Sequence, residues 1–142
     1  MTLTQDRRAQ LIGACSLFRG LDPAGLAAVA VASIEVEFPD QRVIARQGEI
    51  GTGFFVIVDG GVRVVRDGSV IARMGPGEFF GELSVLDGGP RIAQVVADGP
   101  ARCLALASWD FERVLREEPG VALSILRIVA GRLREVSSDH RT

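Results

Sequence analysis

The sequence predicts a mainly β domain, an antiparallel sandwich or barrel with helices at both ends. At least seven short apolar or alternating segments lie within residues 33–107, and turn-forming residues separate them. On both sides of this region, apolar residues recur at helical spacing. The length of 142 residues fits one domain, so we expect residues 1–142 to form a single unit.

Residues 1–32 are expected to form two helices in a hairpin. Asp22 is placed to cap the second helix, and Pro23 suits its first position, where no backbone N–H is needed. The apolar residues at helical spacing are Ala9, Leu11, Ile12, Cys15 and Leu17, and then Leu26, Val29 and Ala30.

Residues 33–107 are expected to form the strands, because the apolar period changes to two. Asp67-Gly68 is the strongest hairpin signal, since these residue types accept the positive φ of a tight two-residue turn. The segments expected as strands are 34–38, 43–44, 54–58, 62–65, 70–72, 92–97 and 101–107.

Residues 108–138 are expected to form two helices, with Ser108 as the N-cap of the first and Pro119 at the start of the second. The second helix has a coiled-coil spacing, which favours either packing on the strands or a homodimer. That spacing joins Ala122, Leu126, Val129, Leu133 and Val136, and the homodimer contact would use the last four. A further stripe that could pack on the strands instead contains Val121, Ile125 and Ile128.

The composition excludes several classes of protein. Apolar residues make up 47% and charged residues 24%, as in a folded globular protein, and the net charge of -2 gives no general attraction to nucleic acid or membrane. The cysteines, Cys15 and Cys103, are far apart, and His140 is the single histidine, which argues against a disulfide framework or zinc site. There is no signal-peptide pattern or bilayer-length apolar run, so we expect a cytoplasmic protein without membrane contact.

The segment 77–98, GEFFGELSVLDGGPRIAQVVAD, concentrates charge and glycine between two expected strands. A helical turn that starts at Gly81 would present free amides to an anion, and Arg91 would add a planar, bidentate donor. Phosphate fits this pair, and Glu82 then needs a neutral donor such as a sugar hydroxyl. The alternative is a surface ion pair between Glu82 and Arg91, usually worth under ~1 kcal/mol, which leaves the glycines unexplained.

Gly81-Glu82-Leu83, followed by Pro90-Arg91-Ile92-Ala93, resembles the phosphate-binding cassette of cyclic nucleotide-binding domains. This family includes sensors of the catabolite activator protein type and the regulatory subunits of protein kinase A. The resemblance covers almost the whole chain, since LFRGLDPAGLAAVA, RQGEIGTGFFVIVDGGVRVV and MGPGEFFGEL are similar to the segments that precede the family's cassette. It implies an antiparallel β-roll of jelly-roll type with the cassette at residues 80–93.

The resemblance also implies a role for each cassette residue. Arg91 would hold the cyclic phosphate, and Glu82 with the backbone of Gly81 would bind the ribose 2′-hydroxyl. The amides of Ser84 and Ile92 would complete the phosphate contacts. The implied ligand-binding residues are Gly81, Glu82, Leu83, Ser84, Arg91, Ile92 and Ala93.

Ile92 favours cyclic AMP over cyclic GMP as the ligand. Family members that prefer cyclic GMP often carry threonine at this position, where its hydroxyl meets the guanine amino group, and isoleucine cannot make that bond. The family caps the base with a residue of the last helix, but this chain has no tyrosine to stack there, and Trp109 is expected in the core. The candidate lid contacts are Ile128, Arg132, Ser137 and Ser138.

These features together indicate a regulatory sensor that binds cyclic AMP, moves its C-terminal helices in response and acts on an effector that the sequence does not identify. No recognition helix or basic arm is recognised, so we expect no nucleic-acid contact by this chain itself. The alternatives are a module of the same fold that no longer responds to nucleotide, or the sensor half of a transcription regulator. Without a suitable histidine, cysteine or carboxylate cluster, we expect no catalytic residue, no metal and no enzyme activity.

Overall fold

The structure is a computed structural model that describes residues 2–51 and 53–139. The α-helices are α1 (Gln5–Ala14), α2 (Pro23–Ala32), α3 (Glu82–Asp87), α4 (Ser108–Glu117) and α5 (Pro119–Asp139), and a short 3-10 helix, η1 (Ser16–Phe18), follows α1. The strands are β1 (Ile34–Phe38), β2 (Val43–Ala45), β3 (Gly53–Asp59), β4 (Val62–Arg66), β5 (Ser69–Met74), β6 (Phe79–Phe80), β7 (Gln94–Ala97) and β8 (Ala101–Ala107).

The strands form two antiparallel sheets with the orders β1-β8-β3-β6 and β2-β7-β4-β5. The first sheet joins the two ends of the strand region, because Ile34 pairs with Ala105 and Phe38 with Ala101. This confirms the predicted antiparallel roll with helices before and after it, and its strands divide between two four-stranded sheets.

Two local turns follow the predicted chemistry. Asp22 caps α2, since its Oδ1 accepts a hydrogen bond from the Gly25 amide at 2.7 Å, and Pro23 occupies the first helical position. Asp67 and Gly68 join β4 to β5 with φ angles of 53° and 81°, which are the positive values that a tight hairpin turn requires. Both signals therefore mark element boundaries correctly.

A cluster of phenylalanines anchors the helices to the first sheet. Phe54 of β3 is fully buried and stacks on Phe111 of α4, with ring centroids 4.5 Å apart and planes at 11°. Phe18 of η1 contacts the Phe54 ring edge-on, with ring centroids 5.9 Å apart. Because α5 follows α4 directly, this cluster fixes the point from which α5 extends.

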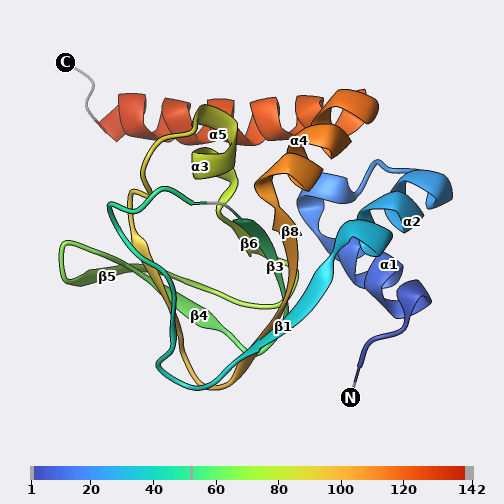
Figure 1. Cartoon of the computed structure of the whole chain (residues 1–142). Coiled ribbons are helices and arrows are strands. Elements are labelled where there is room, and N and C mark those ends of the chain that lie inside the picture. Colours follow the sequence, from blue (N-terminus) through green and yellow to red (C-terminus); the bar gives the residue numbers. More distant parts are fainter. Residues whose placement is uncertain (1, 52, 140–142) are drawn as a thin grey trace.

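Helix α5 crosses one end of the molecule next to α3, while α1, α2 and α4 lie beside the strands (Figure 1). Its inner stripe is the one formed by Val121, Ile125 and Ile128. Val121 and Ile125 are buried in the main core, and Ile128 packs against it half-buried. The second apolar stripe of the sequence therefore faces the domain.

The predicted coiled-coil seam of α5 is divided between core and solvent. Leu126 and Leu133 each expose 65% of their surface, whereas Val129 packs partly buried against the core. The side chain of Val136 lies outside the described part of the structure. The solvent face of α5 thus carries two leucines one heptad apart.

Two expectations for α4 are wrong. Helix α4 begins at Ser108, so its N-cap is Ala107 and no side chain caps it. Trp109 is 69% exposed rather than in the core, because the buried face of α4 is formed by Phe111 and Val114.

Candidate functional site

The turn between β6 and α3 requires glycine at position 81. Gly81 has a φ of 95°, and a Cβ atom there would lie 2.5 Å from the carbonyl oxygen of Gly53. Helix α3 then runs for six residues to Asp87, and Gly88, whose φ is 69°, caps its C-terminus. The tight turn brings the start of α3 against the start of β3.

Arg91 is held by the loop between β2 and β3. Its amide donates to the Glu49 carbonyl at 2.7 Å, and its own carbonyl accepts from the Gly48 amide at 2.8 Å. An isolated bridge between Ile50 and Pro90 continues this pairing. The Arg91 backbone is therefore fixed on both sides of its Cα atom.

The Arg91 side chain is half-buried and reaches the start of β3, where Nη2 donates to the Gly53 carbonyl at 3.3 Å. Burial lowers the pKa of the guanidinium, and the negative charges of Glu49 and Glu82 act in the opposite direction. An arginine side chain stays protonated at neutral pH even after such a shift. Arg91 therefore supplies a positive charge beside the α3 turn.

Glu82 is 5% exposed and is paired with α5 rather than with Arg91. Its Oε1 accepts from Arg132 Nη1 at 2.5 Å, and Arg132 is half-exposed. The alternative of a surface ion pair between Glu82 and Arg91 is therefore wrong, because Glu82 is buried and pairs with Arg132. Arg132 connects α5 to the carboxylate that the family resemblance assigns to the sugar.

A cavity of about 300 Å³ lies between these groups. Arg132 of α5 is one of the residues that line it. The predicted site residues that line it are Gly81, Glu82, Ser84, Arg91, Ile92 and Ala93, and the side chain of Leu83 lies outside the described part of the structure. The structure therefore brings both ends of the cassette to one cavity.

Among the candidate lid contacts whose side chains the structure describes, Ile128 does not line this cavity. Ile128 lines a neighbouring hollow of about 220 Å³ that shares Arg132 with the main cavity. The side chains of Ser137 and Ser138 lie outside the described residues. Of the four candidates, Arg132 is the one that the structure places at the cavity.

Sequence reasoning found Ile92 and Ala93 but missed the rest of the apolar wall of the cavity. Ile92 is 57% exposed, and Ile71 of the edge strand β5 is 49% exposed, so both present apolar surface at its mouth. The signal in the sequence was the apolar run at residues 70–72. This run lies on an edge strand and has no core to pack against. The other apolar residues that line the cavity are Val64, Ala72, Met74, Phe79, Phe80, Ala93 and Val95.

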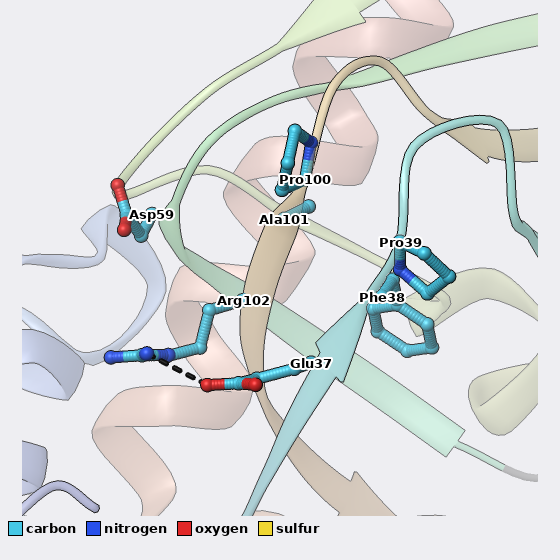
Figure 2. Close-up of a pocket in the computed structure, with 7 residues that line it drawn as sticks. All are labelled: Glu37, Phe38, Pro39, Asp59, Pro100, Ala101 and Arg102. Carbon is cyan, nitrogen blue, oxygen red and sulfur yellow. Dashed lines mark hydrogen bonds and ion pairs between the residues drawn. The ribbon is translucent and has the colours of Figure 1, made fainter. Parts of the chain in front are cut away.

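A larger hollow of about 480 Å³ lies at the opposite end of β3, and Figure 2 shows the residues around it. Its one cation, Arg102, is paired with Glu37 at 2.7 Å and with Glu35 at 3.4 Å. Because these carboxylates neutralise the guanidinium, the hollow lacks the free positive charge that a phosphate needs. The cavity beside Arg91 is the better candidate site.

The chain also matches a known family model. The model described as cyclic nucleotide-binding domain covers residues 35–118, which include both sheets, the α3 turn and α4. The chain belongs to the cyclic nucleotide-binding domain family. The match agrees with the resemblance that the cassette residues indicated.

Relatives within the cyclic nucleotide-binding domain family include bacterial regulators. A CRP-like cAMP-activated global transcriptional regulator of Mycobacterium tuberculosis is 29% identical over 140 residues, which is 92% of this chain and 60% of the relative. The cyclic AMP receptor protein of Thermus thermophilus is 35% identical over 128 residues, 87% of this chain and 59% of the relative. The chain thus spans about three fifths of the length of these relatives.

A solved structure of the family shares the fold. The catabolite activator protein of Thermus thermophilus has a TM-score of 0.81 and 34% identity, and the match covers 87% of this chain and 61% of that one. Among the described residues, no helix is long and apolar enough to cross a membrane. Nor do residues 2–51 and 53–139 contain a group of three or more histidine, cysteine, aspartate or glutamate residues that could hold a metal ion.

Proposed function

We propose that this cyclic nucleotide-binding domain is a sensor for cyclic AMP, with Arg91 on the phosphate and Glu82 on the ribose 2′-hydroxyl. The observation that carries the proposal is one cavity with a half-buried guanidinium and a buried carboxylate on its lining. A guanidinium offers a planar fork to phosphate oxygens, and a carboxylate accepts from a hydroxyl. A cyclic nucleotide carries both partners on one small ring system.

The apolar mouth of the cavity supports adenine over guanine. Ile71 and Ile92 offer apolar surface to a purine, and neither side chain can accept from the amino group of guanine. The name of the Mycobacterium tuberculosis relative describes it as cAMP-activated. Cyclic AMP is therefore the ligand that we propose, and cyclic GMP is the comparison ligand.

The proposed response runs through Arg132. A ribose hydroxyl that reaches Glu82 must share or replace the hydrogen bond from Arg132, so the nucleotide and α5 meet at one carboxylate. A ligand shifts such an equilibrium only by its difference in affinity for the two arrangements. Binding would therefore change the position of α5 relative to the cassette.

Calorimetry with cyclic AMP tests the proposal. Replacing Arg91 by alanine removes a hydrogen bond to a charged group, so we expect affinity to fall by about tenfold to a hundredfold. Arg116→Ala is the matched control, because the Arg116 side chain on α4 is 82% exposed and does not line the cavity. Unchanged affinity in Arg91→Ala would contradict the role of Arg91, and absence of binding by the unmodified chain would favour a module that no longer responds to nucleotide.

We propose further that the domain binds cyclic AMP without hydrolysing it. Among the described residues, the cavity lining contains no cysteine or histidine that could act as a nucleophile or base, and its carboxylate is already bonded to Arg132. Cyclic AMP incubated with the protein should be recovered unchanged by chromatography, and the appearance of AMP would overturn this. The cytoplasmic location and the effector stay predictions from the sequence.

We propose that α5 is also a homodimer contact, through the exposed Leu126 and Leu133. Two leucines at 65% exposure, one heptad apart, fit a helix-to-helix seam. Sedimentation of Leu126→Glu/Leu133→Glu should show a smaller particle than the unmodified chain. Arg127→Ala/Arg134→Ala, on exposed positions of the same helix, changes the net charge by the same amount and is the control for a charge change alone.

A further inference from the structure

The backbone of Gly51 lies against the flat face of the Arg91 guanidinium. A Cβ atom at Gly51 would be 2.6 Å from Arg91 Cζ, 2.7 Å from Nε and 2.7 Å from Nη2. No point in the plane of the guanidinium is that far from all three atoms at once, so the Cβ position lies above the plane. Gly51 is buried, and it therefore stacks on the guanidinium rather than touching its edge.

Two more glycines complete the contact. A Cβ atom at Gly81 would lie 3.3 Å from Arg91 Nη1, and the Gly53 carbonyl accepts from Nη2 at 3.3 Å. The guanidinium thus rests in a slot formed by the backbone of Gly51, Gly53 and Gly81, and we call this the glycine slot. Side chains at Gly51 or Gly81 would occupy space that the guanidinium or its neighbours already fill.

The orientation of this plane matters because all N–H bonds of a guanidinium lie in it. Phosphate oxygens make two parallel hydrogen bonds only when they approach along the edge of the plane. Contact on the flat face fixes the plane and leaves edge nitrogens available. A lysine at the same position would be a point charge, and its attraction to phosphate would not depend on a plane.

We infer that Gly51 is a positioning residue, which orients the Arg91 guanidinium for a bidentate contact with the ligand phosphate. The steric part of the inference concerns the protein alone, whereas the phosphate part rests on the proposed function. Gly51 does not itself touch the ligand in this role. Its substitution by alanine would tilt or displace the guanidinium, because the backbone of Arg91 is tied to Glu49 and Gly48 and cannot move away.

The steric part is tested by urea unfolding without ligand. Gly51→Ala should lower the unfolding midpoint in the unmodified chain and lower it much less in an Arg91→Ala background, where the guanidinium is absent. Gly20→Ala is the control, since a Cβ atom at Gly20 meets nothing within 4 Å and its φ is not positive. Equal losses in the two backgrounds would overturn the contact. If Gly51→Ala alone does not fold, recovery of folded protein in Gly51→Ala/Arg91→Ala supports the contact, and failure to recover overturns it.

The phosphate part is tested by cyclic AMP affinity. Gly51→Ala should weaken binding at least about tenfold, which corresponds to the loss of one arm of a charged bidentate contact. In an Arg91→Lys background the same substitution should change affinity less than about twofold, because no plane remains to be oriented. Equal weakening in the Arg91 and Lys backgrounds overturns the positioning role. If the unmodified chain binds no cyclic AMP, the proposed function fails and the phosphate part with it, while the unfolding experiment still decides the contact.

Discussion

Arg132 Nη1 lies 2.5 Å from Glu82 Oε1, and this hydrogen bond joins α5 to the first residue of α3. The two ends of the bond differ in their surroundings, because the Glu82 side chain is 7% exposed and the Arg132 side chain is 46% exposed. Solvent weakens the attraction at the arginine end, whereas the carboxylate depends on its partner. The bond is therefore a modest link between two elements that are far apart in the sequence.

Removing Arg132 should destabilise the domain by a small but measurable amount. In Arg132→Ala the buried carboxylate of Glu82 loses its partner, and we expect the free energy of unfolding to fall by about 1 kcal/mol. Urea unfolding measures this change. Arg127→Ala removes an exposed arginine from the same helix and should cost less than about 0.5 kcal/mol. Equal losses in the two variants would show that the contact with Glu82 contributes nothing.

Gly81→Ala should be more damaging than Gly88→Ala, although both glycines have positive φ. At Gly88 a Cβ atom meets nothing within 4 Å, so alanine costs only the strain of the left-handed backbone, about 1 kcal/mol. At Gly81 the Cβ atom would also lie 2.5 Å from the Gly53 carbonyl oxygen, and we expect a loss above about 2 kcal/mol. Similar unfolding midpoints for the two variants would contradict the close approach of the α3 turn to β3.

Alkaline pH should destabilise the domain through its two buried thiols. Burial raises the pKa of Cys103 to about 12 and also raises the pKa of Cys15, from an ordinary value of 9.0. At a pH between the ordinary and the raised pKa, the thiols of the unfolded chain lose protons that the thiols of the folded protein keep. The free energy of unfolding is therefore constant below the ordinary thiol pKa and falls as pH rises above it.

The thiols are the side chains that titrate in this range, because the sequence contains no lysine or tyrosine and arginine titrates above it. We expect the free energy of unfolding to fall by about 1 kcal/mol through Cys103 between about pH 8 and about pH 10, and to fall further through Cys15. Denaturation curves at the two pH values measure it. The variant Cys15→Ala/Cys103→Ala should show a much flatter dependence, and an unchanged slope in this variant would assign the effect elsewhere.

Local features of the fold were predictable from short stretches of sequence. Asp22-Pro23 and Asp67-Gly68 each set a boundary through the chemistry of adjacent residues, so no distant contact was needed.

Trp109 shows that the hydrophobicity of one residue does not by itself predict burial. It lies on the same side of α4 as Glu112 and Arg113, and this spacing already indicated a solvent face.

The contacts that complete the site were not predictable in this way. The cassette motif supplied Gly81, Glu82 and Arg91, but the partner of Glu82 is 50 positions away on α5, and Gly51 stacks on a side chain 40 positions later. Such pairs depend on how the sheets and helices pack, and a single sequence contains no periodicity that reports them. The division of the strands into two sheets is equally non-local, since β1 pairs with β8.

The two polar groups of the cavity, Arg91 and Glu82, differ in how free they are to bind a ligand. Arg91 is already docked on the loop between β2 and β3, whereas Glu82 is occupied by Arg132. For a nucleotide bound as proposed above, we expect the phosphate to be captured first and the sugar to engage only after Arg132 gives way. Stopped-flow traces should then contain a phase whose rate rises with nucleotide concentration, followed by one whose rate reaches a plateau. The rate of the proposed response would then be set by the Arg132 side chain of α5 rather than by diffusion of the nucleotide.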